Sequence, residues 1–81
     1  MSPRLRRLSG KEVVAVPSRF GFAVITQQGS HAKLRRFGTQ GERETLVVPM
    51  HDELDAGTLR AIIRQASKYV PQEQLRPHFW S

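Results

Sequence analysis

The sequence has no cysteine, few aromatic residues and no long run of apolar residues. The absence of cysteine excludes a disulfide framework and any metal site built on thiolates. No segment approaches the ~20 apolar residues that a membrane span requires. The first residues, Met-Ser-Pro-Arg-Leu-Arg-Arg, lack the apolar centre of a signal peptide. We therefore expect a cytoplasmic protein that does not bind membranes.

Acidic residues are also scarce. Seven Asp and Glu stand against 13 Lys and Arg, which gives the 81-residue chain a formal net charge of +6. This excess favours a phosphate-rich partner, because each phosphate that is neutralised releases condensed counterions. The length fits one domain with a thin core. The composition therefore favours a single domain that binds nucleic acid.

The chain divides into three segments by composition. Residues 1–8 read as a basic, poorly ordered lead-in, residues 9–70 as the folded domain, and residues 71–81 as a C-terminal tail. The tail has room for one further helical turn at residues 72–75. Its Phe79 and Trp80 either dock on the domain or serve a partner as an apolar anchor.

The helix signals lie at the two ends of the domain. Ser9 and Glu12 have the spacing of a capping box, which predicts a helix that begins at Gly10. Pro17 lacks a backbone N–H, so this helix is predicted to kink or stop near Val16. A second helix is predicted from one apolar stripe, with Asp55 as its cap and Pro71 as its end. The stripe consists of Leu59, Ile62, Ile63, Ala66 and Val70.

Between the helices, the sequence predicts three strands, at residues 22–28, 31–36 and 44–49. Their connections are too short for a parallel crossover, so the strands form an antiparallel meander. The predicted fold is therefore α+β in the order α-β-β-β-α, with two helices on one face of a three-stranded antiparallel sheet.

The candidate chemistry rests on histidine. The sequence has no catalytic pair of carboxylates, no glycine-rich phosphate loop and no metal-ligand spacing, so no metal and no cofactor is expected. His31 follows a Gly-Ser turn and shares a strand face with Lys33 and Arg35. An imidazole accepts a proton near neutral pH, and the two cations are suited to a phosphate beside it. From spacing alone, a plain surface histidine at a strand start is the favoured interpretation.

Such a face fits RNA cleavage, because RNA carries its own nucleophile in the 2′-hydroxyl. One positioned base and a few donors around the phosphate then suffice, and the product ends in a cyclic phosphate. The other candidate contacts to RNA could equally form a solvated basic face. They are Ser30, Arg36 and the basic ridge, which consists of Arg60, Arg64 and Lys68 on the second helix.

Several motifs occur in a familiar order and spacing. They are Ser9-Gly10-Lys11-Glu12, Gly21-Phe22, Gly29-Ser30-His31, Val48-Pro49-Met50-His51, Glu53-Leu54 and the run from Gly57 to Ala66. In these motifs the chain resembles the HicA mRNA-interferase toxins over about residues 9–70. The sequence differs from the family pattern at Pro17, where the family usually has leucine.

The resemblance implies a double-stranded-RNA-binding-domain-like fold and an endoribonuclease that cleaves mRNA. It also implies that His31 is the catalytic residue and that a cognate HicB-type antitoxin is the partner; the free toxin is expected to be monomeric. Two alternatives stay open: a non-catalytic RNA-binding module on the same fold, and an interaction protein whose basic face meets an acidic partner. The fold alone does not decide between them.

Overall fold

The structure is a computed structural model that describes residues 3–81. The part of the predicted lead-in that falls on residues 1 and 2 lies outside the described residues. The elements follow the order α1 (Gly10–Ser18), β1 (Ala23–Gln28), β2 (His31–Phe37), β3 (Arg43–Pro49), α2 (Ala56–Ala66) and α3 (Gln72–Phe79). The predicted α-β-β-β-α order is confirmed, and α3 is added at its end.

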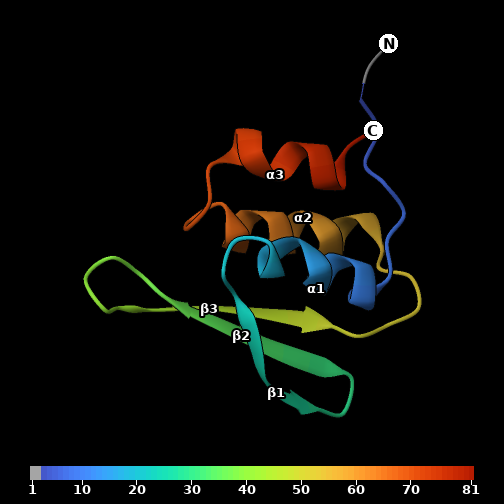
Figure 1. Cartoon of the computed structure of the whole chain (residues 1–81). Coiled ribbons are helices and arrows are strands. Elements are labelled where there is room, and N and C mark those ends of the chain that lie inside the picture. The colour runs from blue at the N-terminus through green and yellow to red at the C-terminus, as the bar shows by residue number, and fades with distance from the viewer. Residues whose placement is uncertain (1–2) are drawn as a thin grey trace.

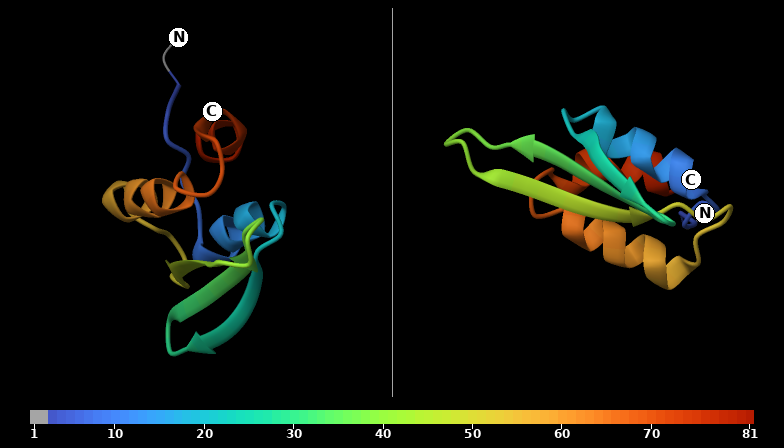
Figure 2. Two further views of the ribbon diagram at one scale, coloured as in Figure 1. Left: turned by 90° about the vertical axis from the view of Figure 1, so that its left-hand side faces the viewer. Right: turned by 90° about the horizontal axis from the view of Figure 1, so that it is seen from below.

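The three strands form one antiparallel sheet in the order β1-β2-β3, so β2 is central. Figures 1 and 2 show α1 and α2 covering one face of this sheet, while the other face carries no helix. The third helix lies on the far side of α1 and α2 from the sheet. The predicted two-helix layer is therefore present, and α3 forms a further layer above it.

Both main helices begin with the caps that the sequence predicts. The Ser9 hydroxyl accepts from the Glu12 N–H at 3.1 Å, and the Glu12 carboxylate accepts from the Ser9 N–H at 2.9 Å. At α2, the Asp55 carboxylate accepts from the Thr58 N–H at 2.7 Å. This backbone hydrogen bond lowers the pKa of Asp55, which keeps a negative charge at the positive end of the helix.

Both predicted helix ends are wrong by a few residues. Pro17 lies inside α1, which continues to Ser18 and then closes with i→i−3 bonds, such as Phe20 N–H to Pro17 C=O at 2.9 Å. Pro17 lacks the N–H that would bond to the Val13 carbonyl, and the helix ends one residue after it. The second helix ends at Ala66 rather than at Pro71. Its chain turns through residues 67–70, and Pro71 becomes the first cap of α3.

The C-terminal segment is part of the core. Leu75 and Phe79 on α3 are 2% and 1% exposed and join the same apolar cluster as Leu59 and Ile62 of α2. Phe79 therefore docks on the domain, and it is not free to anchor a partner. The expectation of a single helical turn at residues 72–75 was too short, because α3 continues through Pro77.

The lead-in is also tied down over the described residues. Arg4 exchanges two backbone hydrogen bonds with Ser81, each 2.8 Å long, and the Arg6 N–H donates to the Phe79 carbonyl. Leu8 is buried in the core. The expectation of a poorly ordered segment does not hold for residues 3–8, because these residues pair with the end of the chain.

Gly10 places α1 directly against the end of β3. Its N–H donates to the His51 carbonyl at 2.9 Å, and a Cβ at this position would collide with the Pro49 carbonyl oxygen and lie 2.6 Å from the Met50 Cα. These neighbours are backbone atoms, which cannot rotate away. Since Pro49 pairs with His31 across the sheet, Gly10 also fixes the strand end beside the candidate histidine.

We expect Gly10→Ala to lower the free energy of unfolding by about 1–3 kcal/mol through this overpacking. Gly57→Ala is the matched control, because a Cβ there meets only the Asp55 carboxylate at an ordinary 3.5 Å. Alanine in the first turn of α2 should leave stability unchanged or raise it. Thermal unfolding of both variants checks this, and equal melting temperatures would contradict the close approach at Gly10.

Candidate functional site

The side of the sheet that no helix of residues 3–81 covers forms an open face (Figures 1 and 2). Along β2, Ala32 and Leu34 are fully buried beneath the helices, and the alternate residues point the other way. His31 and Lys33 are exposed on the open face, and Arg35 follows on the same side. The structure therefore brings together the three residues that the sequence grouped by alternation.

The Gly-Ser turn explains why His31 stands first on its strand. Gln28 pairs with His31, so Gly29 and Ser30 form a two-residue hairpin connection. Gly29 has a φ of 56°, and among the described residues only glycines have positive φ. A positive φ at the first turn position alone is the pattern of a type II′ turn, which favours glycine there. His31 is therefore the first residue of β2 and follows the turn directly.

Ser30 ties this turn to the neighbouring strand end. Its carbonyl oxygen accepts a hydrogen bond from the Met50 N–H, while its side chain stays exposed. Pro49 lies opposite His31 on β3. His31 is therefore held by backbone contacts on both sides, and its imidazole remains accessible to a ligand.

A shallow hollow of about 520 Å³ surrounds these side chains on the open face. It is lined by Ile25, Thr26, Gln28, His31, Ala32, Lys33, Arg35 and Val47. The spacing of alternate strand residues puts Lys33 about 7 Å and Arg35 about 13 Å from His31 along the strand. An extended anion of more than one phosphate matches this row of one imidazole and two cations.

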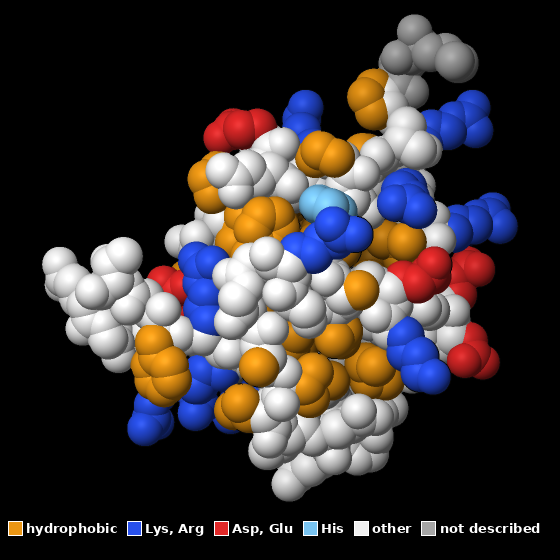
Figure 3. Space-filling view, in the orientation of Figure 1, with side chains coloured by type: hydrophobic (Ala, Val, Ile, Leu, Met, Phe, Trp, Pro, Cys, Tyr) orange, Lys and Arg blue, Asp and Glu red, His pale blue; other side chains and the backbone are white. Residues whose placement is uncertain are grey.

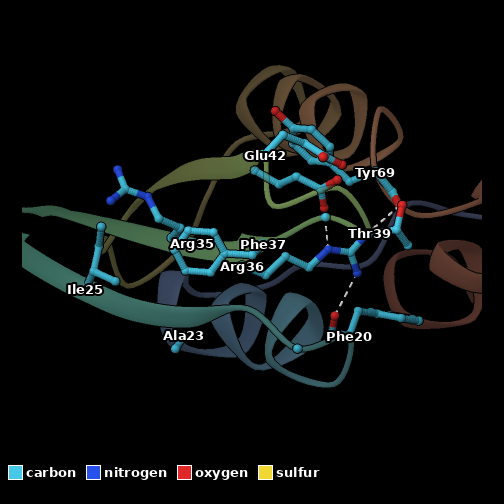
Figure 4. A pocket seen from close by; sticks show the side chains of 12 residues that line it. Phe20, Ala23, Ile25, Arg35, Arg36, Phe37, Thr39, Glu42 and Tyr69 are labelled. Carbon is cyan, nitrogen blue, oxygen red and sulfur yellow. Dashed lines mark hydrogen bonds and ion pairs between the residues drawn. The ribbon is translucent and has the colours of Figure 1, made fainter.

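The Nε–H of Arg35 makes no hydrogen bond to the described residues, although this nitrogen is buried from solvent. A buried donor without a partner is costly, so a movement of the side chain that brings Nε to a ligand acceptor would be favourable. Arg35 and Ile25 also line a second hollow, of about 910 Å³, whose lining includes Phe37 at the end of β2 (Figure 4).

Arg36, predicted from the sequence as an RNA contact, does not lie on the open face; the structure gives its guanidinium protein partners instead. Arg36 lies on the same side of β2 as Ala32 and Leu34, because alternate residues of a strand point the same way. Its side chain therefore turns toward the helices. Its Nε donates to Glu44 at 2.5 Å, and its terminal nitrogens donate to the Phe20 and Tyr69 carbonyls, each at 2.7 Å (Figure 4). Because three protein acceptors already occupy its guanidinium, Arg36 holds the fold together.

The basic ridge also lies away from His31. Arg60 and Arg64 are exposed on α2, and Lys68 is exposed in the turn that follows it, in the layer behind the sheet. The Arg60 guanidinium stands 6.0 Å from the centre of the Trp80 ring, on the side of α3. The structure therefore separates the predicted basic residues into two surfaces, and only the open face contains a histidine that shares a hollow with cations.

The other two histidines have structural surroundings. His51 is exposed after β3, and its carbonyl accepts from Gly10. His78 on α3 packs edge-on against Phe20 at 6.0 Å between ring centres. Within residues 3–81, no three His, Cys, Asp or Glu side chains come close enough to hold a metal ion. In the same residues, no helix is long and apolar enough to cross a membrane.

The open face also carries an exposed aromatic residue. Phe37 continues the alternation from His31 through Lys33 and Arg35, and it is 65% exposed. Val47 and Ile25, 40% and 42% exposed, lie on the flanking strands of the same sheet. In the space-filling view, exposed hydrophobic side chains gather over the strands in the lower half, with Lys and Arg at their flanks (Figure 3).

Comparison with known proteins gives one match. The sequence model of a family described as HicA toxin of bacterial toxin-antitoxin systems matches residues 10–67, which include α1, the whole sheet and α2. No curated protein and no solved structure matches the chain significantly.

Proposed function

Since the chain belongs to the HicA toxin family of bacterial toxin–antitoxin systems, we propose that it is an endoribonuclease that cleaves mRNA on the open face. The observation that carries the proposal is the row of His31, Lys33 and Arg35 in one accessible hollow. A phosphate bound beside His31 faces the imidazole, which is the proton acceptor. The next phosphates of the RNA, farther along β2, face Lys33 and Arg35.

The reaction needs one proton acceptor and no external nucleophile. The His31 imidazole takes the proton of a 2′-hydroxyl as the oxygen forms a bond to the adjacent phosphorus. The bond from phosphorus to the 5′-oxygen breaks, and that oxygen leaves with a proton from the imidazolium or from water. Lys33 and Arg35 stabilise the negative charge that grows on the phosphoryl oxygens. The products are a 2′,3′-cyclic phosphate and a free 5′-hydroxyl.

RNA binding to the open face should weaken steeply with salt. If the protein neutralises about three to five phosphates of a single strand, log affinity falls against log salt with a slope near −2 to −3.5. Lys33→Ala and Arg35→Ala should each flatten the slope by about 0.7, because each removes one phosphate contact. Fluorescence anisotropy with a hexanucleotide at several salt concentrations measures these slopes.

The matched control is Arg64→Ala on the basic ridge. Because the ridge lies behind the sheet, this variant should leave the slope for a hexanucleotide unchanged and affect only RNA long enough to pass around the molecule. A salt-independent affinity for the unaltered protein would argue against phosphate binding on any surface.

We further propose that an acidic antitoxin of the HicB type covers the open face. A net charge of +6 steers an acidic surface toward this protein, and burial of His31 would block access to RNA. The basic ridge offers a second contact. Co-expression with the neighbouring reading frame should yield a complex that neither binds nor cleaves RNA. A complex that cleaves at the full rate would contradict this arrangement.

A further inference from the structure

Phe37 is a large apolar side chain left in solvent beside cations. At 65% it is the most exposed of the large hydrophobic residues that the structure describes, yet it lies on the central strand rather than at a chain end. Its partner across the sheet is Arg43 of β3, and Arg35 precedes it on the same side of β2. An exposed aromatic ring between two arginines has the chemistry of a stacking platform for nucleobases.

The hollow next to Phe37 is lined by apolar, basic and acidic residues. Ile25, Arg35 and Phe37 line it (Figure 4). Glu42, Glu44 and Arg36 line it as well, and Arg36 forms an ion pair with Glu44. Glu44 is neutralised by Arg36, so Glu42 is the carboxylate that repels phosphate here, and a backbone phosphate is favoured at Arg35. The planar, uncharged part of a nucleotide is then the group that fits against the Phe37 ring.

We propose that Phe37 stacks on one unpaired base of the bound RNA and sets where the strand is held relative to His31. This inference rests on the proposed function and adds the form of its substrate. His31 and Phe37 are six residues apart on β2, about 20 Å along the strand. That distance spans about three to six nucleotides, the upper limit being set by the ~3.4 Å spacing of stacked nucleotides in one strand. The substrate is therefore single-stranded over this stretch.

Binding is best measured with His31→Ala as the background, so that the RNA stays intact. Adding Phe37→Ala should weaken the affinity for a single-stranded octanucleotide by about 5- to 150-fold, the range expected for the loss of one stacked base. Phe37→Trp should restore or exceed the original affinity. The salt slope should stay unchanged in both, since no phosphate contact is lost. Melting temperatures should also stay unchanged, because the side chain is exposed.

A series of octanucleotides with one abasic position each then tests the geometry. The protein with Phe37 should bind one member of the series weakly, at a fixed distance from the bond that the unaltered protein cleaves. The Phe37→Ala protein should bind all members equally. A position-dependent loss that persists without Phe37 would overturn the inference.

The outcomes separate this inference from the proposed function. If the unaltered protein cleaves RNA and Phe37→Ala changes neither affinity nor the abasic profile, the stacking role is wrong and the nuclease stands. If Phe37→Ala weakens only the complex with the antitoxin, the ring belongs to a protein interface and the stacking role is again wrong. If the unaltered protein neither binds nor cleaves RNA, the proposed function itself fails.

Discussion

Replacing His31 by alanine should reduce the rate of RNA cleavage by about 10²- to 10⁴-fold, the usual loss when a general base is removed. The cleavage of single-stranded RNA by the unaltered protein should persist in excess chelator, because the proposed reaction uses no metal. RNA that carries a 2′-deoxy sugar at the cleaved position should resist both proteins. Product analysis should find the cyclic phosphate.

The matched control is His78→Gln, which changes a histidine that packs against Phe20 in the helical layers. It should cleave at the original rate. His31→Ala should keep most of the RNA affinity, since Lys33 and Arg35 remain. Equal cleavage by the His31→Ala and unaltered proteins would remove His31 from the mechanism. RNA binding without cleavage by the unaltered protein would favour the non-catalytic RNA-binding module.

The second large effect is expected at Arg36, where Arg36→Met should lower the free energy of unfolding by about 2–4 kcal/mol. The substitution removes three hydrogen bonds that join β2 to β3, to the turn after α1 and to the turn after α2. It also leaves the carboxylate of Glu44, whose side chain is 13% exposed, without its cation. Arg36→Lys should not rescue the loss, because an ammonium cannot reach three acceptors that diverge in this way.

Arg35→Met is the natural comparison, since the two residues are neighbours on one strand and differ in the face they occupy. It should change stability by no more than about 0.5 kcal/mol, as most surface substitutions do. RNA affinity should show the opposite pattern. It should fall in Arg35→Met, and the folded fraction of Arg36→Met should keep the original affinity. Thermal unfolding and anisotropy measure the two effects. Equal melting temperatures for the two variants would contradict the structural role of Arg36.

The fold was largely predictable because its local signals agree with one another. The capping box at Ser9, the Gly29-Ser30 turn and the apolar stripe from Leu59 each specify one element without reference to the rest of the chain. The open face followed from alternation along β2. The same alternation places Arg36 under the helices, but the two adjacent arginines read as one basic cluster when only their charge is considered.

The ends of the chain were not predictable in the same way. The stability of α3 comes from Leu75 and Phe79, which pack onto residues that are distant in sequence. The pairing of Arg4 with Ser81 is another contact of this kind. Neither leaves a periodic pattern in the sequence, because each depends on the finished tertiary structure.

The pairing of the chain ends has a consequence for the order in which the protein forms and opens. The two hairpins close loops of a few residues, whereas the contact between Arg4 and Ser81 closes almost the whole chain and carries a larger entropic cost. We expect the end segments to join last and to fray first, so that amide hydrogen exchange begins there. The row of His31, Lys33 and Arg35 is built entirely on the hairpins, so we expect the open face to persist through these partial openings.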